Sequence, residues 1–425
     1  MQESKSLGIS APTKSLSPLT LQIIPARVVE ENNAIYLEKI DEAGKYYKTV
    51  IENDRKAYHL SLGNNQNLKG DFYYHILNIS SKCNLNCLYC YTANNKQDEI
   101  STSEIINIGK RYRNKVFVLG GQEPTCRSDL PKIINIIARY NYPCLATNGI
   151  KLMNLSYLKN LKAAGLKHIF FSLNALDEDI LYQMHGQHVL AEKLRALDNI
   201  KQLRIPTIIS TSILRGMNED QIPKIFHFCL NKGEFIYELR IRNMFPFPNQ
   251  IMQKAYCISE LIHLTCRQLG LDSENLQYEY RLFDELNRYL KIKAIARKSC
   301  SSFFHIKRMP DRQIIMLGQL IKGFGNNLWH QWWLYSSLLA GLSRKFLLNL
   351  FRKSSPYVLP GFFKLSFRVW PNVYNIDLGE LERKCSTCYH ENENEIAFCL
   401  WNIYHSYYSD LQKPQRQSQI YCRDY

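Results

Sequence analysis

The chain has 425 residues, of which 45% are hydrophobic and 22% charged, so it can build a buried core and wholesale disorder is excluded. Its formal net charge of +16 favours an anionic partner, such as a nucleic acid, phospholipid head groups or an acidic substrate, without choosing among them. The thirteen cysteines, the polar start MQESKSLGIS and the lack of any run of 18 apolar residues predict a cytoplasmic protein with reduced or metal-bound thiols and no membrane span.

The N-terminal region, residues 1–70, is expected to be a lead-in followed by a small β module. Residues 1–18 are rich in Ser, Lys, Thr and Pro, which is typical of a frayed terminus. In 21–60, the segments LQIIPARVVEE and NAIYLEKI read as short strands separated by Asn32 and Asn33.

The core, residues 71–250, alternates apolar runs with helix-like segments. The strand candidates are 74–80, 115–120, 142–148, 167–175, 207–214 and 237–245. The helix candidates lie near 102–114, 129–140, 154–164, 188–203 and 219–232, with N-caps expected at Ser103 and Asp129. This alternation predicts a parallel α/β sheet or barrel, with ligand chemistry at the carboxyl ends of the strands. The proline-rich FPFP at 245–248 then leads into a less regular C-terminal domain, residues 251–425.

Three cysteines follow the first core strand directly, namely Cys83, Cys87 and Cys90 in SKCNLNCLYCYT. Three thiolates on one short loop can hold three corners of a [4Fe–4S] cluster and leave the fourth iron open to a ligand. A structural zinc ion would need a fourth ligand nearby, and no further Cys or His follows within thirty residues. The spacing therefore favours an iron–sulfur cluster over zinc or coincidence.

With this triplet, residues 71–250 resemble the radical S-adenosylmethionine (SAM) superfamily. The resemblance implies a partial (βα)6 barrel, a [4Fe–4S] cluster whose open iron chelates SAM, and Tyr89 against the adenine of the cofactor. It also implies an enzyme that takes an electron from a partner such as ferredoxin or flavodoxin and cleaves SAM reductively. The resulting 5′-deoxyadenosyl radical would remove hydrogen from an unactivated carbon.

The second core strand carries a further part of the resemblance. It ends in LGGQEPT, similar to the Gly-Gly-Glu-Pro motif of the family, with Gln122 where the second glycine is usual. Glycine lets the backbone approach the cofactor closely. The resemblance therefore assigns Gly120 and Gly121 to cofactor binding and Glu123 to the methionyl ammonium group.

Later strand ends add polar candidates. The third strand ends in TNG, a form common in the superfamily, with Asn148 at its centre. The resemblance assigns Asn148, Ser172, Asn174 and Ser212 to cofactor binding. Ser172 and Asn174 could instead cap the next helix. Arg215, just beyond the fifth strand, could pair with the carboxylate of the cofactor or be a solvated surface side chain.

Three segments are similar to one branch of the superfamily, the archaeal tetraether lipid synthases and the pterin-directed radical methyltransferases. They are residues 25–60, 214–218 and 375–402. Those relatives carry metal-binding cysteines in the first segment, whereas this chain has none before Cys83. We therefore expect a metal-free β module, and the branch makes a lipid or long-chain substrate our first choice.

The C-terminal domain offers ligands for a second, auxiliary [4Fe–4S] cluster. The candidates are Cys300, Cys385, Cys388 and Cys399. Cys257 and Cys266 compete for the place of Cys300, and a zinc ion or unmetallated thiols would also suit this spacing. Three other cysteines lie in apolar contexts and are expected to be core residues: Cys126, Cys144 and Cys229.

The segment 326–355 combines Trp329, Trp332 and Trp333 with Leu, Phe and four basic residues. This pattern is typical of a helix that lies in a membrane interface, where the basic net charge would favour anionic lipid. A buried helical pair is the alternative. Peripheral membrane association would suit a lipid substrate.

The leading interpretation is a radical SAM enzyme with two iron–sulfur clusters that acts on a small molecule or lipid. A peptide maturase is the second enzymatic candidate, although the first 70 residues do not resemble a leader-peptide recognition domain. A basic nucleic-acid-binding metalloprotein and a non-catalytic metal scaffold represent other classes. Because the Lys and Arg residues are spread along the chain, no nucleic-acid partner is expected.

Overall fold

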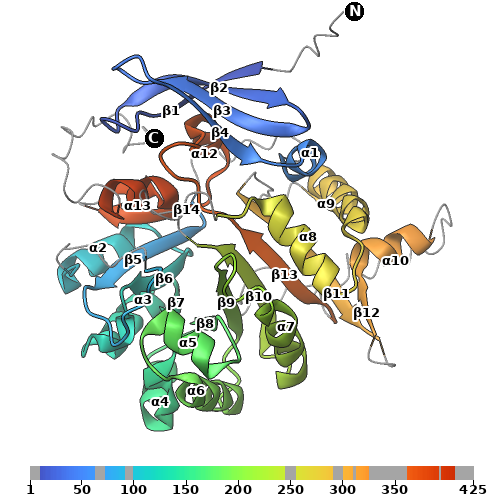
Figure 1. Cartoon of the computed structure of the whole chain (residues 1–425). Helices are drawn as coiled ribbons and strands as arrows, with labels where there is room; N and C mark the ends of the chain where they lie inside the picture. Colours follow the sequence, from blue (N-terminus) through green and yellow to red (C-terminus); the bar gives the residue numbers. More distant parts are fainter. Residues whose placement is uncertain are drawn as a thin grey trace, which may run out of the picture.

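Two β-sheets organise the molecule (Figure 1). The computed structural model describes residues 10–62, 72–90, 99–244, 255–290, 300–309, 313–324, 361–391 and 394–406. The predicted interfacial segment 329–351 and the predicted domain boundary at 250 lie outside these residues.

The smaller sheet is antiparallel, in the order β1-β2-β3-β4. Its strands are β1 (Ser10–Leu16), β2 (Ile23–Glu31), β3 (Ala34–Ile40) and β4 (Tyr46–Glu52), followed by helix α1 (Arg55–Leu62). Asn32 and Asn33 join β2 to β3 with φ angles of 50° and 64°, the left-handed conformations that a two-residue hairpin turn requires. The predicted β module is confirmed. The frayed lead-in is wrong for Ser10–Leu16, because this segment pairs residue by residue with β2.

The larger sheet has eleven strands among the described residues, and its centre is the six-stranded parallel unit that the sequence predicts. These strands are β5 (Tyr74–Ser80), β6 (Val116–Gly121), β7 (Tyr142–Thr147), β8 (His168–Ser172), β9 (Thr207–Ile213) and β10 (Ile236–Asn243). They neighbour one another in chain order. β9 is buried at every position, as expected of a strand covered on both faces. The α/β fold with a partial (βα)6 unit is therefore confirmed.

Helices follow these strands along the chain. They are α2 (Thr102–Arg111), α3 (Leu130–Ala138), α4 (Leu155–Ala163), α5 (Glu178–His185), α6 (Leu190–Gln202) and α7 (Gln221–Lys232). Asp129 is the N-cap of α3 as predicted. The N-cap of α2 is Ser101 and not Ser103, because the Ser101 side chain accepts from the Glu104 N–H. Helix α5 was not predicted, because a helix this short carries little periodic pattern.

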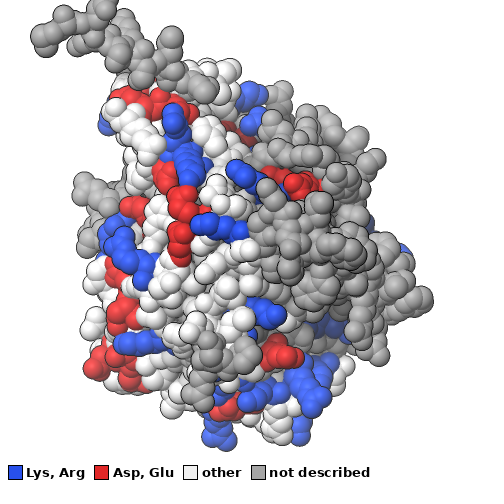
Figure 2. All heavy atoms as spheres, turned by 90° about the vertical axis from the view of Figure 1, so that its right-hand side faces the viewer, with Lys and Arg blue, Asp and Glu red and all other residues white. Residues whose placement is uncertain are grey.

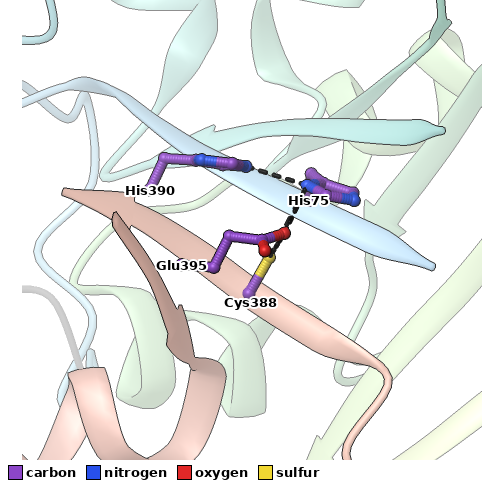
Figure 3. A group of neighbouring side chains, drawn as sticks. All are labelled: His75, Cys388, His390 and Glu395. Carbon is purple, nitrogen blue, oxygen red and sulfur yellow. Dashed lines mark hydrogen bonds and ion pairs between the residues drawn. The ribbon is translucent and has the colours of Figure 1, made fainter. Parts of the chain in front are cut away.

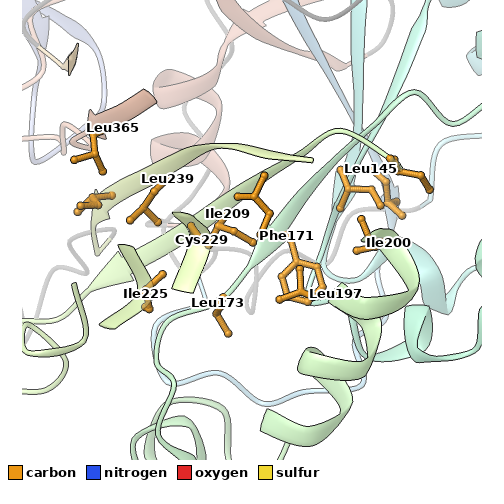
Figure 4. Packing of buried hydrophobic residues seen from close by; sticks show 14 of the residues in the cluster. Leu145, Phe171, Leu173, Leu197, Ile200, Ile209, Ile225, Cys229, Leu239 and Leu365 are labelled. Atoms are coloured by element: carbon orange, nitrogen blue, oxygen red, sulfur yellow. The ribbon is translucent and has the colours of Figure 1, made fainter. Parts of the chain in front are cut away.

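The main core lies between the parallel strands and their helices (Figure 4). Leu145 and Phe171 on neighbouring strands belong to the same cluster as Leu197 and Ile200 of α6, and all four are fully buried. Burying a large apolar side chain contributes about 1.5–3 kcal/mol. This packing fixes α6 against the sheet and so fixes Lys193, which lies on the same helix.

The C-terminal region extends the larger sheet at both edges. β13 (Phe363–Arg368) pairs in parallel with β10, and β14 (Thr387–Glu391) pairs in parallel with β5. The outer strands are β11 (Ser301–Arg308), β12 (Ile314–Met316) and β15 (Asn394–Ala397). The helices of this region are α8 (Ile258–Gln268), α9 (Leu276–Leu290), α10 (Leu317–Phe324), α12 (Leu378–Lys384) and α13 (Phe398–Ser406). Strand pairing thus joins the regions that we assign to separate core and C-terminal domains.

A buried lysine ties the small sheet to the C-terminal region. Lys39 Nζ donates to Ser15 Oγ at 3.0 Å and to Leu16 O at 2.7 Å, both within the small sheet. It also donates to Val373 O at 2.5 Å. Burial lowers the pKa of Lys39 to about 7, so the three acceptors compensate a costly desolvation of its ammonium group.

The described surface carries charges of both signs. On the face in Figure 2, Lys and Arg side chains lie among Asp and Glu, without a continuous basic area among the described residues. Two basic segments of the sequence, 291–299 and 325–360, lie outside those residues. In the described part of the chain, no helix combines the length and apolar character needed to cross a membrane.

Candidate active site

The three predicted cluster ligands lie on the thiol loop, residues 83–90, directly after the carboxyl end of β5. The end of α5 holds this loop in place. Asn86 N–H donates to His185 O at 3.3 Å, and Cys87 Sγ lies 3.0 Å from His185 Nδ1. Burial lowers the pKa of His185 to about 3, so its ring is neutral beside the sulfur. His185 was not predicted, because the helix that carries it was not predicted either.

Burial disfavours the thiolate form of two of the loop thiols. Burial raises the pKa of Cys83 to about 11 and that of Cys87 to about 12, and neighbouring thiols add to both shifts. A bound metal cation deprotonates its thiol ligands. Three closely spaced thiols on one loop fit an iron–sulfur cluster with one open iron.

Lys193 lies close to the thiol loop, and its side chain is fully buried. Its Nζ donates to Asn148 O at 2.7 Å and to Ser172 O at 2.9 Å, at the carboxyl ends of β7 and β8. Burial lowers the pKa of Lys193 to about 8, although Cys87 and Glu123 act in the opposite direction. A single lysine on an amphipathic helix reads as a surface residue, so no sequence signal identified it.

Glu123 points into the protein and is 1% exposed. Its Oε1 accepts from Thr125 N–H at 3.1 Å, Thr125 Oγ1 at 2.7 Å and Thr147 Oγ1 at 2.7 Å. Its Oε2 accepts from Asn148 N–H at 2.7 Å. The carboxylate thus ties the end of β6 to the end of β7. Each carboxylate oxygen can accept more than one hydrogen bond, so these contacts leave room for an ammonium donor. The contact of Glu123 with the ammonium group of SAM stays a prediction.

A polar chain, here called the Tyr89 network, links the thiol loop to the ends of β8, β9 and β10. Its members are Tyr89, Asn174, Ser212 and Arg242. Asn174 Nδ2 contacts the Tyr89 hydroxyl, Asn174 Oδ1 accepts from Ser212 N–H at 2.8 Å, and Arg242 donates to Ser212 Oγ at 3.2 Å. Burial raises the pKa of Tyr89 well above its ordinary value, so its hydroxyl is neutral. Arg242 was not predicted, because it lies within a strand and in no motif.

The capping alternative for Ser172 and Asn174 is wrong. The next helix, α5, has Asp177 as its N-cap, and the Asp177 side chain accepts from Ile180 N–H. Asn174 is instead committed to the Tyr89 network.

Two glycines are required by close approaches at the strand ends. A Cβ on Gly121 would lie 2.5 Å from Ser80 O, and a Cβ on Gly149 would lie 2.1 Å from the Phe171 ring. Both residues have positive φ angles, 114° and 87°, which glycine adopts without strain. Gly120 is less constrained, because its Cβ would meet no atom closer than 3.6 Å.

A cavity of about 420 Å³ lies between β4, α8 and α12. Four thiols line it: Cys257, Cys300, Cys385 and Cys399. Arg215 lines the same cavity, where it donates to Glu260 Oε1 at 3.1 Å and lies 3.9 Å from the centre of the Tyr256 ring. The structure therefore places Arg215 with the cysteine cavity, and Arg242 is the arginine of the Tyr89 network.

Cys388 does not line this cavity. It is fully buried in β14, opposite His75 of β5 in the strand register. Cys257, at the N-cap of α8, joins the other three predicted thiols in its place. Of the three expected core cysteines, Cys144 and Cys229 are buried. Cys126 is partly exposed and lies beside the thiol loop.

The central unit matches a known family in sequence. Residues 77–229 match the model of the Radical SAM superfamily. The chain carries a radical SAM domain. The matched residues include the thiol loop, Glu123 and three members of the Tyr89 network. Radical SAM proteins use a [4Fe–4S] cluster and SAM, in agreement with the donor set of the thiol loop.

The radical SAM relatives are enzymes. A 7,8-dihydro-6-hydroxymethylpterin dimethyltransferase of Methanocaldococcus jannaschii is 27% identical over 258 residues, which are 53% of this chain and 51% of the relative. A probable GTP 3′,8-cyclase of Pyrococcus abyssi is 32% identical over 161 residues, which are 36% of this chain and 51% of the relative. The chain thus spans about half the length of these curated relatives.

Solved radical SAM structures also match part of the chain. SuiB of Streptococcus suis bound to S-adenosylmethionine has 15% sequence identity and a TM-score of 0.40, covering 52% of this chain and 48% of SuiB. Native anSMEcpe with bound AdoMet has 17% identity and a TM-score of 0.39, covering 55% of this chain and 70% of that one.

Proposed function

We propose that this chain is a radical SAM enzyme whose first [4Fe–4S] cluster is bound by Cys83, Cys87 and Cys90. One observation carries the proposal: the three thiols share a loop at the carboxyl edge of six parallel strands, and the Tyr89 network lies at the same edge. When bound, the cluster and SAM supply a one-electron reductive cleavage that generates a carbon-centred radical able to remove hydrogen from an unactivated carbon.

Side chains at this edge would bind and orient the cluster and SAM. Lys193 offsets the negative charge of the thiolates within a buried environment, where charge interactions are strong. The Tyr89 network offers an aromatic ring, an amide and a guanidinium, which suit the adenine, the ribose hydroxyls and the carboxylate of SAM. Glu123 fixes the ends of β6 and β7 and can accept from the ammonium group.

The second cluster of this proposal occupies the cysteine cavity. A fully ligated cubane takes four thiolates, and Cys257, Cys300, Cys385 and Cys399 line one cavity of about 420 Å³. This set replaces Cys388 of the predicted set by Cys257. Arg215 in the cavity wall offers a positive charge to a cluster bound by four thiolates.

The substrate of this proposal is a small molecule or a lipid, with ferredoxin or flavodoxin as electron donor. A lipid substrate is supported by the branch resemblance and by the Trp-rich segment 326–355. An enzyme that acts on a lipid would be cytoplasmic and peripherally associated with the membrane. A pterin is the second candidate, because the M. jannaschii relative is named for one. SAM cleavage measured with a dihydropterin or with a long-chain lipid as the added substrate separates the two, since the true substrate should stimulate cleavage and donate hydrogen.

Anaerobic purification and assay test the proposal. The wild-type protein should contain about eight irons per chain, as two cubane clusters require, and should form 5′-deoxyadenosine from SAM and dithionite. The triple variant C83A/C87A/C90A should lose about half of the iron and all 5′-deoxyadenosine formation. Cys144→Ala, in the buried part of β7, is the control and should retain both. Formation of 5′-deoxyadenosine by the triple variant would disprove the assignment.

A further inference from the structure

We propose that His75, Cys388, His390 and Glu395 bind a structural zinc ion that fastens the C-terminal β-hairpin to the first strand of the barrel (Figure 3). The four ligand atoms lie within 4.8 Å of one another, and all but Glu395 belong to buried residues. This zinc quartet is separate from both the thiol loop and the cysteine cavity. It does not depend on the proposed enzymatic activity.

Strand register brings the zinc quartet together. Cys388 of β14 lies opposite His75 of β5 in the parallel pairing. His390 follows two positions later, so it points to the same face of the sheet. Glu395 of β15 lies opposite His390 across the antiparallel hairpin. Three neighbouring strands therefore place four ligand side chains on one face, in positions fixed by backbone hydrogen bonds.

The distances in the zinc quartet suit tetrahedral coordination. Zinc binds nitrogen and oxygen at about 2.0–2.2 Å and sulfur at about 2.3 Å, so ligand atoms of a tetrahedral site are separated by roughly 3.3–3.8 Å. His75 Nδ1 lies 3.5 Å from Glu395 Oε1 and 3.6 Å from Cys388 Sγ. Cys388 Sγ lies 3.7 Å from Glu395 Oε1. The two imidazole nitrogens are closer, at 2.8 Å, and would separate by a few tenths of an ångström around an ion.

The tautomer of His75 leaves the correct nitrogen for a metal. His75 Nε2 lies 3.1 Å from Phe72 O. Because a carbonyl oxygen can only accept, Nε2 carries the proton and Nδ1 has a lone pair facing the other three ligands. Metal-bound histidines are commonly held in this way, with the second ring nitrogen donating to a backbone carbonyl.

The donor set and its charge select zinc. A thiolate and a carboxylate carry two negative charges, and two neutral imidazoles add none, so a divalent cation makes the site neutral. Iron–sulfur clusters favour sulfur ligands and calcium or magnesium favours oxygen, whereas a closed mixed set of N, S and O suits zinc.

The position of the zinc quartet indicates a structural role. His75 lies at the amino end of β5, whereas the thiol loop follows the carboxyl end. At about 3.3 Å per residue along a strand, the two lie on the order of 20 Å apart. The parallel pairing of β14 with β5 spans only three positions, Thr387 to Tyr389. A metal bridge at this pairing would hold residues 313 positions apart in the chain and fasten the hairpin to β5.

Metal analysis of the full-length protein tests this proposal. The wild type should contain about one zinc per chain, measured by plasma mass spectrometry after purification without chelators or a metal-affinity tag. Cys388→Ala and Glu395→Gln should lose the zinc and retain the iron. Cys385→Ala, three positions earlier in the same segment, is the matched control and should lose iron while retaining zinc.

Thermal unfolding gives a second measurement that remains useful if one variant folds poorly. A zinc-selective chelator should lower the melting temperature of the wild type, and added Zn²⁺ should restore it, whereas Glu395→Gln should respond to neither. Loss of about half the iron in Cys388→Ala would make Cys388 a cluster ligand and overturn the proposal. A wild-type protein with only trace zinc and a melting temperature insensitive to the chelator would overturn it as well.

Discussion

The two metal sites proposed at opposite ends of β5 are built in opposite ways. At the carboxyl end, three ligands lie within eight consecutive residues of one loop. At the amino end, His75 meets His390, which is 315 positions away, and the site exists only when β14 pairs with β5. Spacing in the sequence can therefore identify the thiol loop. Only strand register can identify the zinc quartet.

The strongest test of this contrast compares SAM cleavage in two kinds of variant. Removing the loop thiols leaves no ligands for the catalytic cluster, so C83A/C87A/C90A should form no 5′-deoxyadenosine. Cys388→Ala alters a site at the amino end of β5, far from the carboxyl ends of the core strands, and should retain measurable formation, although the protein will be less stable. Chromatographic quantification of 5′-deoxyadenosine measures both. Equal loss in the two variants would mean that Cys388 supports the reaction directly.

The same contrast explains what the sequence could and could not predict. The six core strands were recognised because they are short apolar runs such as β9, whose burial depends on local composition. The thiol loop was recognised because ligands that share a loop must have a characteristic spacing. Lys193 and Arg242 were missed because each acts through partners supplied by other elements. The spacing of Cys388 to Cys385 suggested a shared cluster. Because side chains alternate along β14, however, Cys388 lies beside His75 of β5 instead.

Iron content can decide between the two assignments made for Cys257 and Cys266. Cys257 lines the cysteine cavity, whereas Cys266, on the same helix, is buried outside it. Cys257→Ala should lose about four of the eight irons expected for two clusters, and Cys266→Ala should lose none. Iron analysis with Mössbauer or paramagnetic resonance spectroscopy would measure the change. If Cys266→Ala loses the iron instead, the cavity assignment is wrong.

Glu123 tests whether a residue of a cofactor-binding motif also stabilises the fold through hydrogen bonds to a neighbouring strand. Glu123→Ala removes four hydrogen bonds to Thr125, Thr147 and Asn148. We expect weaker SAM binding by about 1.5–3 kcal/mol, the value of a charge-assisted hydrogen bond, together with a lower melting temperature. Equilibrium binding and thermal unfolding measure the two effects separately. A lower melting temperature with unchanged SAM affinity would leave Glu123 only its structural role.

Lys193 should influence the cluster through its charge. Lys193→Met removes a buried cation close to Cys87 and Cys83. Because reduction adds a negative charge to the cluster, losing this cation destabilises the reduced cluster relative to the oxidised one. The midpoint potential should fall by tens of millivolts, on the order expected for a unit charge about 10 Å away in a partly polar interior. Lys162→Met, on the exposed face of α4, is the control and should leave the potential unchanged. A redox titration that finds equal potentials would contradict this role.

The smallest expected effect concerns a buried histidine outside the zinc quartet. His168 is 3% exposed, its Nε2 contacts the Tyr237 hydroxyl, and burial lowers its pKa from 6.5 to about 3. As pH falls below about 6.5, the unfolded chain gains a proton that the folded chain does not, so stability is lost between about pH 6.5 and pH 3 and is unaffected above this range. The loss is up to about 1.4 kcal/mol per pH unit. His168→Gln can keep the contact with Tyr237 without titrating, so its melting temperature should fall less between pH 7 and pH 5.5, by on the order of 2 °C. The same substitution at His227, which is exposed on α7, should leave the pH dependence of the wild type unchanged. If His168→Gln also follows the wild type, His168 is not the neutral buried group described here, and the acid sensitivity arises elsewhere.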